Sequence, residues 1–377
     1  FINLLTVPRG FFIGGATGLA SLGLNTDYLS DDPAAGGGVV RVRSQFSGFG
    51  GATQRGHVFT VAAATMCHEF GHLLGLPDLF DQSSVTATGE LDPVEDSAGI
   101  GNWGLMGLGT LGWGIEDGPN AFSAWSLAKL GWLGTANSRL VEVLATRRGI
   151  EQAPIDAGGE VYRISLTPDE YFLIENRQAS DSYYNRNIPA GGLLIWHVDE
   201  RADNDEERHK QVDLVCADGL FADLGFPGER ADVAGGRDNL DFWAWDESYA
   251  LEHNGNVGDT GDPFDGVTYQ RFAADTNPGL RGHVGADRGN PLGIAIEEIR
   301  PLGGGVMGYN ILFGQPVEGN VSSDTTWSDR IILSGDVIVD PGATLTLAAG
   351  TEVIFSGFDS RSAGFTSTRS ELIIYGR

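Results

Sequence analysis

The segment from His68 to Asp78, HEFGHLLGLPD, constrains the local fold more than any other part of the sequence. The residues before it are apolar or small and suit a buried helix that leads into the segment. Gly75 is placed to end that helix, because glycine adopts the left-handed conformation of a C-terminal cap without steric cost. Pro77 cannot continue a helix. We therefore expect a sharp turn that brings Asp78 back toward the helix.

The two histidines of this segment are spaced to bind one metal ion. Residues four apart lie on one helix face, roughly 6 Å apart along the axis, so His68 and His72 can reach the same ion. Glu69 lies beside the first histidine, where the general base for a zinc-bound water is expected. The alternative is a buried helix whose histidines only satisfy hydrogen bonds, which would leave the clustered polar groups to be explained.

The third metal ligand is expected to be Asp78, which the turn returns toward the histidines. Asp81 lies about one helical turn further along the chain, and Glu90 or Glu95 would come from a later segment. These three residues remain alternatives. The sequence contains no E-x-x-x-D pattern that would support a glutamate from a second helix.

Several motifs, in order along the chain, resemble one protein family. They are HEFGHLLGLPDLFD at 68–81, NWGLM at 102–106, FSAWSLAKLGW at 122–132, YFLIENR at 171–177 and GLLIWHVD at 192–199. They resemble the immune inhibitor A family of secreted bacterial metallopeptidases, and the glycine-rich turn with its methionine is similar to that of the metzincin zinc proteases. The resemblance covers about residues 50–310. It implies that His68, His72 and Asp78 bind zinc, that Glu69 is the base and that Met106 is the turn methionine.

The composition limits the partners of the chain. Its formal net charge is -27, which argues strongly against nucleic acid or an anionic membrane surface as a partner. No stretch approaches the roughly 18 apolar residues of a membrane-spanning helix, so we expect no membrane insertion. A protein or peptide substrate is expected instead. The sequence does not determine the oligomeric state.

Much of the acidity lies in two loops, at 199–207 and 258–266. A solvated surface is the simplest interpretation of each run. The second run alternates aspartate with glycine, which also suits oxygen ligation of a structural calcium ion. The expected cofactors are therefore zinc and, in a structural role, calcium.

The two cysteines, Cys67 and Cys216, are too few for a disulfide scaffold. They form either one bridge or two separate thiols, and Cys67 is expected to have a packing role. The chain begins at Phe1 without a signal peptide, and we expect it to be an excerpt of a longer precursor that is secreted to the extracellular space.

We expect an α+β protein with three regions. Residues 1–135 are expected to form a metzincin-like zinc protease catalytic core whose N-terminal part is truncated. In this region we predict a strand at 39–43 and a helix over 121–130, capped by Asn120 and ended by Gly131.

Residues 136–314 are expected to form a β-rich region packed on the catalytic core. We predict strands at 160–166, 170–175, 192–198 and 293–299. Residues 315–377 contain short alternating runs broken by Asp-Pro-Gly, which predicts a β-strand repeat and the start of a parallel β-helix. A β-sandwich fragment is the alternative for this last region.

Other polar residues receive weaker assignments. His197 and Asp199 share one face of a predicted strand, where they could form a second metal pair. A structural hydrogen-bonding role is favoured, and a place lining the cleft is the next alternative. Tyr171, Tyr183 and Tyr184 are available to hold an oxyanion, but no pattern selects one of them.

The predicted function is that of a secreted zinc-dependent endopeptidase, with a zinc-activated water and Glu69 as general base. One alternative is a secreted adhesive or carbohydrate-binding protein with an inactive protease-like domain. Another is a zinc hydrolase that acts on a non-peptide bond. The intact Glu69 favours an enzyme over a binding module, which has no need of this carboxylate.

Overall fold

The structure is a computed structural model, and it describes part of the chain. The described residues are 17–19, 28–33, 38–42, 48–50, 64, 67–80, 98–110, 112–114, 117–180, 182–205, 209–218, 222–223, 230–231, 240, 257–274, 276–280, 282, 293–355, 361, 363–366 and 369–377. They form a mixed α+β fold that is mostly β-sheet, which confirms the expected class. None of the helices within these residues is long and apolar enough to span a membrane.

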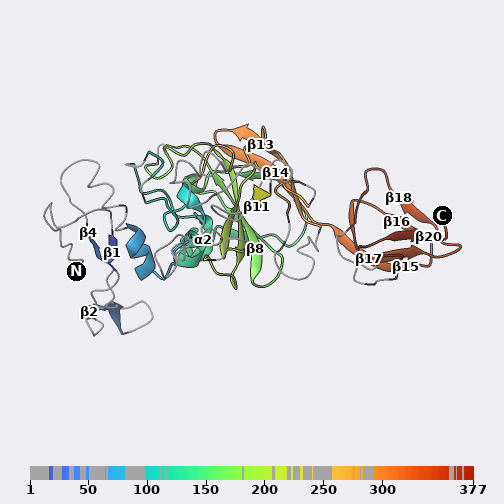
Figure 1. The fold of residues 1–377 in the computed structure, drawn as a ribbon, viewed down its shortest axis with the longest axis horizontal. Helices are drawn as coiled ribbons and strands as arrows, with labels where there is room; N and C mark the ends of the chain where they lie inside the picture. The colour runs from blue at the N-terminus through green and yellow to red at the C-terminus, as the bar shows by residue number, and fades with distance from the viewer. Residues whose placement is uncertain are drawn as a thin grey trace.

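A five-stranded sheet forms the centre of the described fold (Figure 1). Its strand order is β10-β9-β8-β7-β5, and all neighbours are antiparallel except β5 and β7. The strands are β5 Leu140–Glu142, β7 Val161–Ser165, β8 Glu170–Arg177, β9 Gly192–Asp199 and β10 Val212–Val215. Every residue of β8 and β9 is buried, so both faces of the sheet are covered.

Alternate side chains of the two central strands enter two different hydrophobic clusters, because successive residues of a strand point to opposite faces. Leu173 and Trp196 belong to a cluster that also contains Leu79 and Met106 from the predicted metal region. This cluster joins described residues on both sides of position 135, so the predicted catalytic core and the predicted β-rich region share one apolar interior.

The opposite face of the central sheet packs against a three-stranded sheet (Figure 1). That sheet has the order β13-β14-β6 and consists of β6 Arg147–Gln152, β13 Ala295–Gly303 and β14 Val306–Leu312. Phe172 and Ile195 of the central sheet lie in the same cluster as Ile150, Ile296 and Tyr309. The strands predicted at 160–166, 170–175, 192–198 and 293–299 are thereby confirmed.

Helix α2 spans Ala124–Leu130, so the predicted start of this helix was wrong. Its N-cap is Ser123, whose hydroxyl accepts a hydrogen bond from the Ser126 backbone N–H, whereas Asn120 donates to the Asn102 carbonyl oxygen. The predicted stop is confirmed, because Gly131 has a left-handed φ of 73°. Both asparagine and serine suit an N-cap, and the long-range bond of Asn120 decides between them.

In the C-terminal region, the strands among the described residues pair in parallel. These strands are β15 Gln315–Val321, β16 Thr325–Trp327, β17 Arg330–Val339, β18 Leu345–Leu347, β19 Glu352–Phe355 and β20 Leu372–Ile374. β17 pairs with β15, β19 and β20, and β16 pairs with β18. The region has its own apolar cluster, and in Figure 1 it projects from the central body. Short parallel strands are present in this region, and both the strand repeat and the parallel β-helix stay predictions.

The remaining described elements are short. Before residue 51, β1 Thr17–Leu19 pairs with β4 Gly48–Gly50, and β2 Tyr28–Pro33 pairs with β3 Val39–Val42. β3 confirms the strand predicted at 39–43. The others are β11 Ala222–Asp223, β12 Arg230–Ala231 and the 3₁₀ segments η1 Gly101–Trp103, η2 Thr135–Asn137 and η3 Ile155–Ala157.

A buried arginine ties the central sheet to the segments that lie on it. The Arg177 guanidinium, at the end of β8, donates to the carbonyl oxygens of Trp103 and Phe122. It also pairs with Glu175 at 2.7 Å, and both side chains are almost completely buried. Burial raises the pKa of the Glu175 carboxyl, while Arg177 and a hydrogen bond from the Trp196 indole oppose that rise. The strand therefore holds the glycine-rich turn through charge-assisted hydrogen bonds.

We predict that Arg177→Ala lowers the free energy of unfolding by about 3–5 kcal/mol, because it leaves Glu175 as an unpaired buried charge. Urea unfolding measures the change. Arg148→Ala removes an exposed guanidinium and is the matched control, with an expected change within about 0.5 kcal/mol. Equal effects of the two substitutions would contradict the assigned role of Arg177.

Candidate metal centre

Residues 67–73 form a helix that carries both histidines and is called the metal helix below. This helix ends as the sequence predicts. Gly75 has a left-handed φ of 95°. Its N–H donates to the His72 carbonyl oxygen at 3.0 Å, and the Leu76 N–H donates to the Gly71 carbonyl oxygen at 3.1 Å. This pair of bonds is a Schellman motif, which turns the chain sharply at the end of the helix.

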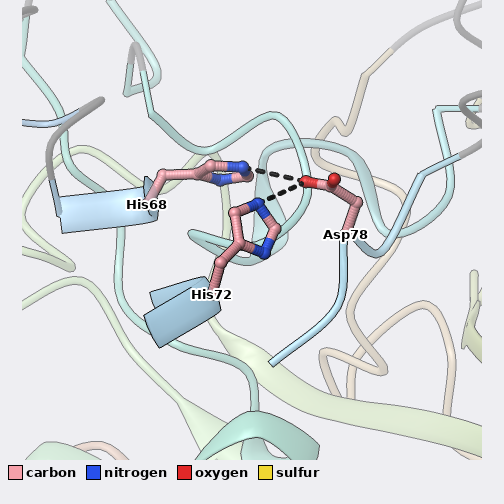
Figure 2. Close-up of side chains that lie close together, drawn as sticks. All are labelled: His68, His72 and Asp78. Atoms are coloured by element: carbon pink, nitrogen blue, oxygen red, sulfur yellow. Dashed lines mark ion pairs between the residues drawn. The ribbon is translucent and has the colours of Figure 1, made fainter. Parts of the chain in front are cut away.

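The turn brings Asp78 back to both histidines, as Figure 2 shows. Its Oδ1 lies 2.9 Å from Nε2 of His68 and 3.3 Å from Nε2 of His72. The two imidazole rings are nearly perpendicular, with centroids 4.9 Å apart. These three side chains are the one group of potential metal ligands that lies close together among the described residues. The predicted third ligand therefore lies where the prediction requires it.

The second nitrogen of each histidine is held by a backbone carbonyl. Nδ1 of His68 donates to the Leu105 oxygen at 2.7 Å, and Nδ1 of His72 donates to the Leu76 oxygen at 2.8 Å. A carbonyl oxygen only accepts, so the proton of each neutral ring is on Nδ1 and the Nε2 lone pair points toward the centre. Metal-binding histidines are oriented in this way by their outer hydrogen bonds.

The spacing of the three donor atoms fits a small tetrahedral ion. Atoms bound at about 2.0–2.1 Å to one tetrahedral zinc lie about 3.3 Å from one another. The distances of 2.9 and 3.3 Å from Asp78 are close to that value, and all three atoms lie within 4.8 Å of one another. Small side-chain adjustments would therefore admit the ion.

When no metal is bound, hydrogen bonds among the same side chains shift the pKa values of His72 and Asp78. The hydrogen bond to Asp78 raises the pKa of His72 to about 9. Burial acts to raise the pKa of Asp78, but the hydrogen bonds from His68 and His72 hold it at about 2. A metal ion and the His72 proton therefore compete for the position next to Asp78.

The glycine-rich turn lies directly against the metal helix. Met106 is fully buried, and a Cβ at Gly71 would clash with its sulfur, so Met106 lies against the helix between the two histidines. The Met106 carbonyl oxygen accepts the Leu79 N–H at 2.8 Å, next to Asp78. This contact is consistent with the role of turn methionine that the resemblance implies for Met106.

A close backbone approach also fixes the segment that follows Asp78. The Ile100 N–H donates to the Leu79 carbonyl oxygen at 3.0 Å. Gly99 has a φ of 59°, and a Cβ there would overlap the backbone of Leu79. Only glycine fits this position without displacing the chain beside the third ligand.

The other predicted site residues have different outcomes. Glu69 is half-buried on the helix that carries both histidines, and its role as a base stays a prediction. The alternative ligands Asp81, Glu90 and Glu95 lie outside the described residues. Cys67 and Cys216 are separate thiols, so the bridge is excluded.

The hydroxyls of Tyr171 and Tyr183 donate hydrogen bonds to groups other than the candidate metal ligands. The Tyr171 hydroxyl donates to Glu200 at 2.6 Å, and the Tyr183 hydroxyl donates to the Gly118 carbonyl oxygen at 2.8 Å. The structural role of His197 and Asp199 is confirmed: Nε2 of His197 lies 2.9 Å from Glu170, and Asp199 lies 2.9 Å from His209.

The aspartates of the predicted calcium loop organise the local backbone. Asp262 is buried and accepts hydrogen bonds from the Trp103 indole and the Asp259 N–H. Oδ1 of Asp265 accepts three backbone N–H groups, those of Val267, Thr268 and Tyr269. Calcium binding at this loop stays a prediction.

Sequence reasoning missed the role of the acidic loop that follows β9. Asn204 is 7% exposed; its Nδ2 donates to the Asp78 carbonyl oxygen at 3.0 Å, and its Oδ1 accepts the Val212 N–H at 3.1 Å. The charge of the run at 199–207 predicts a solvated surface, and no pattern in the sequence marks Asn204 as an exception. Its burial is visible only in the structure, where the amide satisfies its hydrogen bonds as a buried asparagine must.

This loop and the metal ligands line a pocket of about 400 Å³. The described residues around it are His72, Pro77, Asp78, Phe80, Ala202, Asp203, Asn204, Asp205 and Gln211. A ligand in the pocket would therefore touch two of the three candidate metal ligands.

No protein-family model, curated protein or solved structure matches this chain. The resemblance to the immune inhibitor A family therefore depends on the sequence motifs, and the metal centre depends on the geometry of its own residues.

We predict that Asn204→Ala weakens zinc binding by roughly tenfold, because outer hydrogen bonds hold the ligands in position. Competition with a chromophoric chelator measures the affinity. Asn320→Ala, at an exposed amide in the C-terminal region, is the control and should leave the affinity unchanged. Unchanged zinc affinity in a folded Asn204→Ala protein would show that this contact does not position Asp78.

Proposed function

We propose that this chain is a secreted zinc-dependent endopeptidase of the metzincin type, similar to the immune inhibitor A metallopeptidases. The observation that carries the proposal is the convergence of His68, His72 and Asp78, with Glu69 next to the first ligand on the same helix. The extracellular location follows from the family resemblance alone.

The chemistry of the donor atoms favours zinc over other ions. Two imidazole nitrogens and one carboxylate oxygen form a set that zinc accepts in tetrahedral geometry, with one position left for water or substrate. Calcium and magnesium prefer oxygen ligands. If calcium binds, it is expected at the aspartate-rich loop in a structural role.

The metal ligands and Glu69 have separate roles in the proposed peptide hydrolysis. His68, His72 and Asp78 would hold a zinc ion, and the ion would supply a Lewis acid for activating water and polarising the scissile carbonyl. Glu69 accepts a proton from the attacking water and returns it to the leaving amine. The carbonyl oxygens of Leu105 and Leu76 keep the two imidazoles in the orientation that binding requires.

The pocket beside His72 and Asp78 favours an enzyme over an inactive domain. A protease-like domain with only a binding role would have no reason to keep Glu69 beside ordered ligands. The rival function, a secreted adhesive or carbohydrate-binding protein, draws its support from the C-terminal parallel strands, which we propose to be the start of a parallel β-helix. A zinc hydrolase acting on a non-peptide bond is the other rival.

We predict that Glu69→Gln retains zinc but lowers casein cleavage by about 10²–10⁴-fold, since it removes the general base. Zinc content and cleavage are measured on the same samples. Glu151→Gln removes an exposed carboxylate from β6 and is the matched control, with wild-type activity expected.

Each outcome of this experiment discriminates between functions. Wild-type cleavage by Glu69→Gln would refute the assignment of the base. A wild-type protein that binds zinc but cleaves neither casein nor peptides would refute the peptidase and favour one of the two rivals. Absence of stoichiometric zinc would refute the metal centre.

A further inference from the structure

The pocket beside His72 and Asp78 has walls of two kinds. Pro77, Phe80 and Ala202 contribute apolar surface. Asp203 and Asp205 contribute carboxylates from the loop that follows β9. A pocket with apolar and anionic walls matches a ligand group that has an aliphatic stem and a positive end.

The acidic loop gives the pocket two carboxylates besides the candidate metal ligands. With a zinc ion bound, His72 and Asp78 would belong to the metal centre, and the ion would add positive charge there. Asp203 and Asp205 are the other carboxylates among the described lining residues, which include no lysine or arginine. The chain as a whole carries a net charge of -27, which raises the local concentration of cationic ligands.

The pocket has room for one long side chain. Its volume of about 400 Å³ is in the range of pockets that hold small-molecule ligands, so size does not exclude a lysine or arginine side chain. A peptide whose scissile carbonyl lies at the metal centre places a neighbouring side chain within reach of Pro77 and Phe80, because the pocket begins at His72 and Asp78.

We propose that this pocket is the subsite for a lysine or arginine side chain of the substrate, next to the scissile bond. The inference rests on the proposed peptidase function and names its substrate class. The aliphatic stem packs on Pro77 and Phe80, while the ammonium or guanidinium group pairs with Asp203 and Asp205. Asp203 and Asp205 are thereby specificity-determining residues, separate from the groups that bind metal or move protons.

The fold keeps these carboxylates near the metal centre. Asn204 lies between them in the chain and is anchored to Asp78 and to Val212. The Asp203 carboxylate accepts the Asp205 N–H at 3.2 Å. The amide that supports the third ligand therefore also fixes the loop that carries both acidic groups.

The test has a cleavage arm and a binding arm. In the cleavage arm, peptides that differ only in Lys, Arg, norleucine or Glu at each position flanking the scissile bond are compared by kcat/KM. We expect a preference of at least about tenfold for Lys or Arg over norleucine at one position. Asp203→Asn with Asp205→Asn should reduce that preference to less than about twofold and leave zinc content unchanged. Glu151→Gln, at an exposed site outside the pocket, should retain the preference.

In the binding arm, the zinc-loaded Glu69→Gln protein binds the lysine and norleucine peptides, and fluorescence anisotropy measures both affinities. The lysine peptide should bind about tenfold more tightly, and the advantage should shrink at high salt because ionic pairing is screened. The Asp203→Asn and Asp205→Asn substitutions, added to Glu69→Gln, should remove it.

The outcomes separate the two proposals. Cleavage without a preference for basic residues, or a preference that survives in the double variant, would overturn the subsite. An equal loss for all peptides would also overturn it, since general attraction does not discriminate between side chains. A lysine preference in binding without cleavage by the wild type would support the subsite and refute the peptidase.

Discussion

The buried guanidinium of Arg177 is the contact that ties the segments around the candidate metal centre to the central sheet. Through the Trp103 carbonyl oxygen it fixes the start of the glycine-rich turn on the central sheet. Two residues further along, the Leu105 carbonyl oxygen orients His68. The next residue, Met106, packs against the metal helix and holds the backbone beside Asp78. The buried charge of Arg177 thus helps to position His68, Met106 and the backbone beside Asp78.

The part of the centre that could be predicted from the sequence is the part that depends on local chemistry. Gly75 ends the helix because it takes a positive φ, Pro77 prevents its continuation, and the return of Asp78 follows. The central strands were predictable for a similar reason, since β8 and β9 each contain a continuous apolar run, Tyr171–Ile174 and Leu193–Trp196.

The residues whose roles were not predicted form hydrogen bonds with partners far away in the sequence. Asn204 reaches Asp78 across 126 positions, and Arg177 reaches Trp103 across 74. No local pattern encodes such partners, and a charged loop around Asn204 has the composition of a surface. The predicted N-cap of α2 was wrong for the same reason. The Asn120 side chain donates to the Asn102 carbonyl oxygen and does not cap the helix.

The bond from His72 to the Leu76 carbonyl oxygen joins a ligand to the end of its own helix. The ring is therefore oriented by residues at most four positions away, and Asp78 follows two residues later. His72 takes its orientation from its own segment, whereas His68 depends on Leu105 and the backbone of Asp78 is held by Asn204. Grafting residues 68–78 onto the end of an unrelated helix would carry over the turn and the orientation of His72, and the host scaffold would have to supply a carbonyl oxygen for His68 and a side-chain amide for the backbone of Asp78.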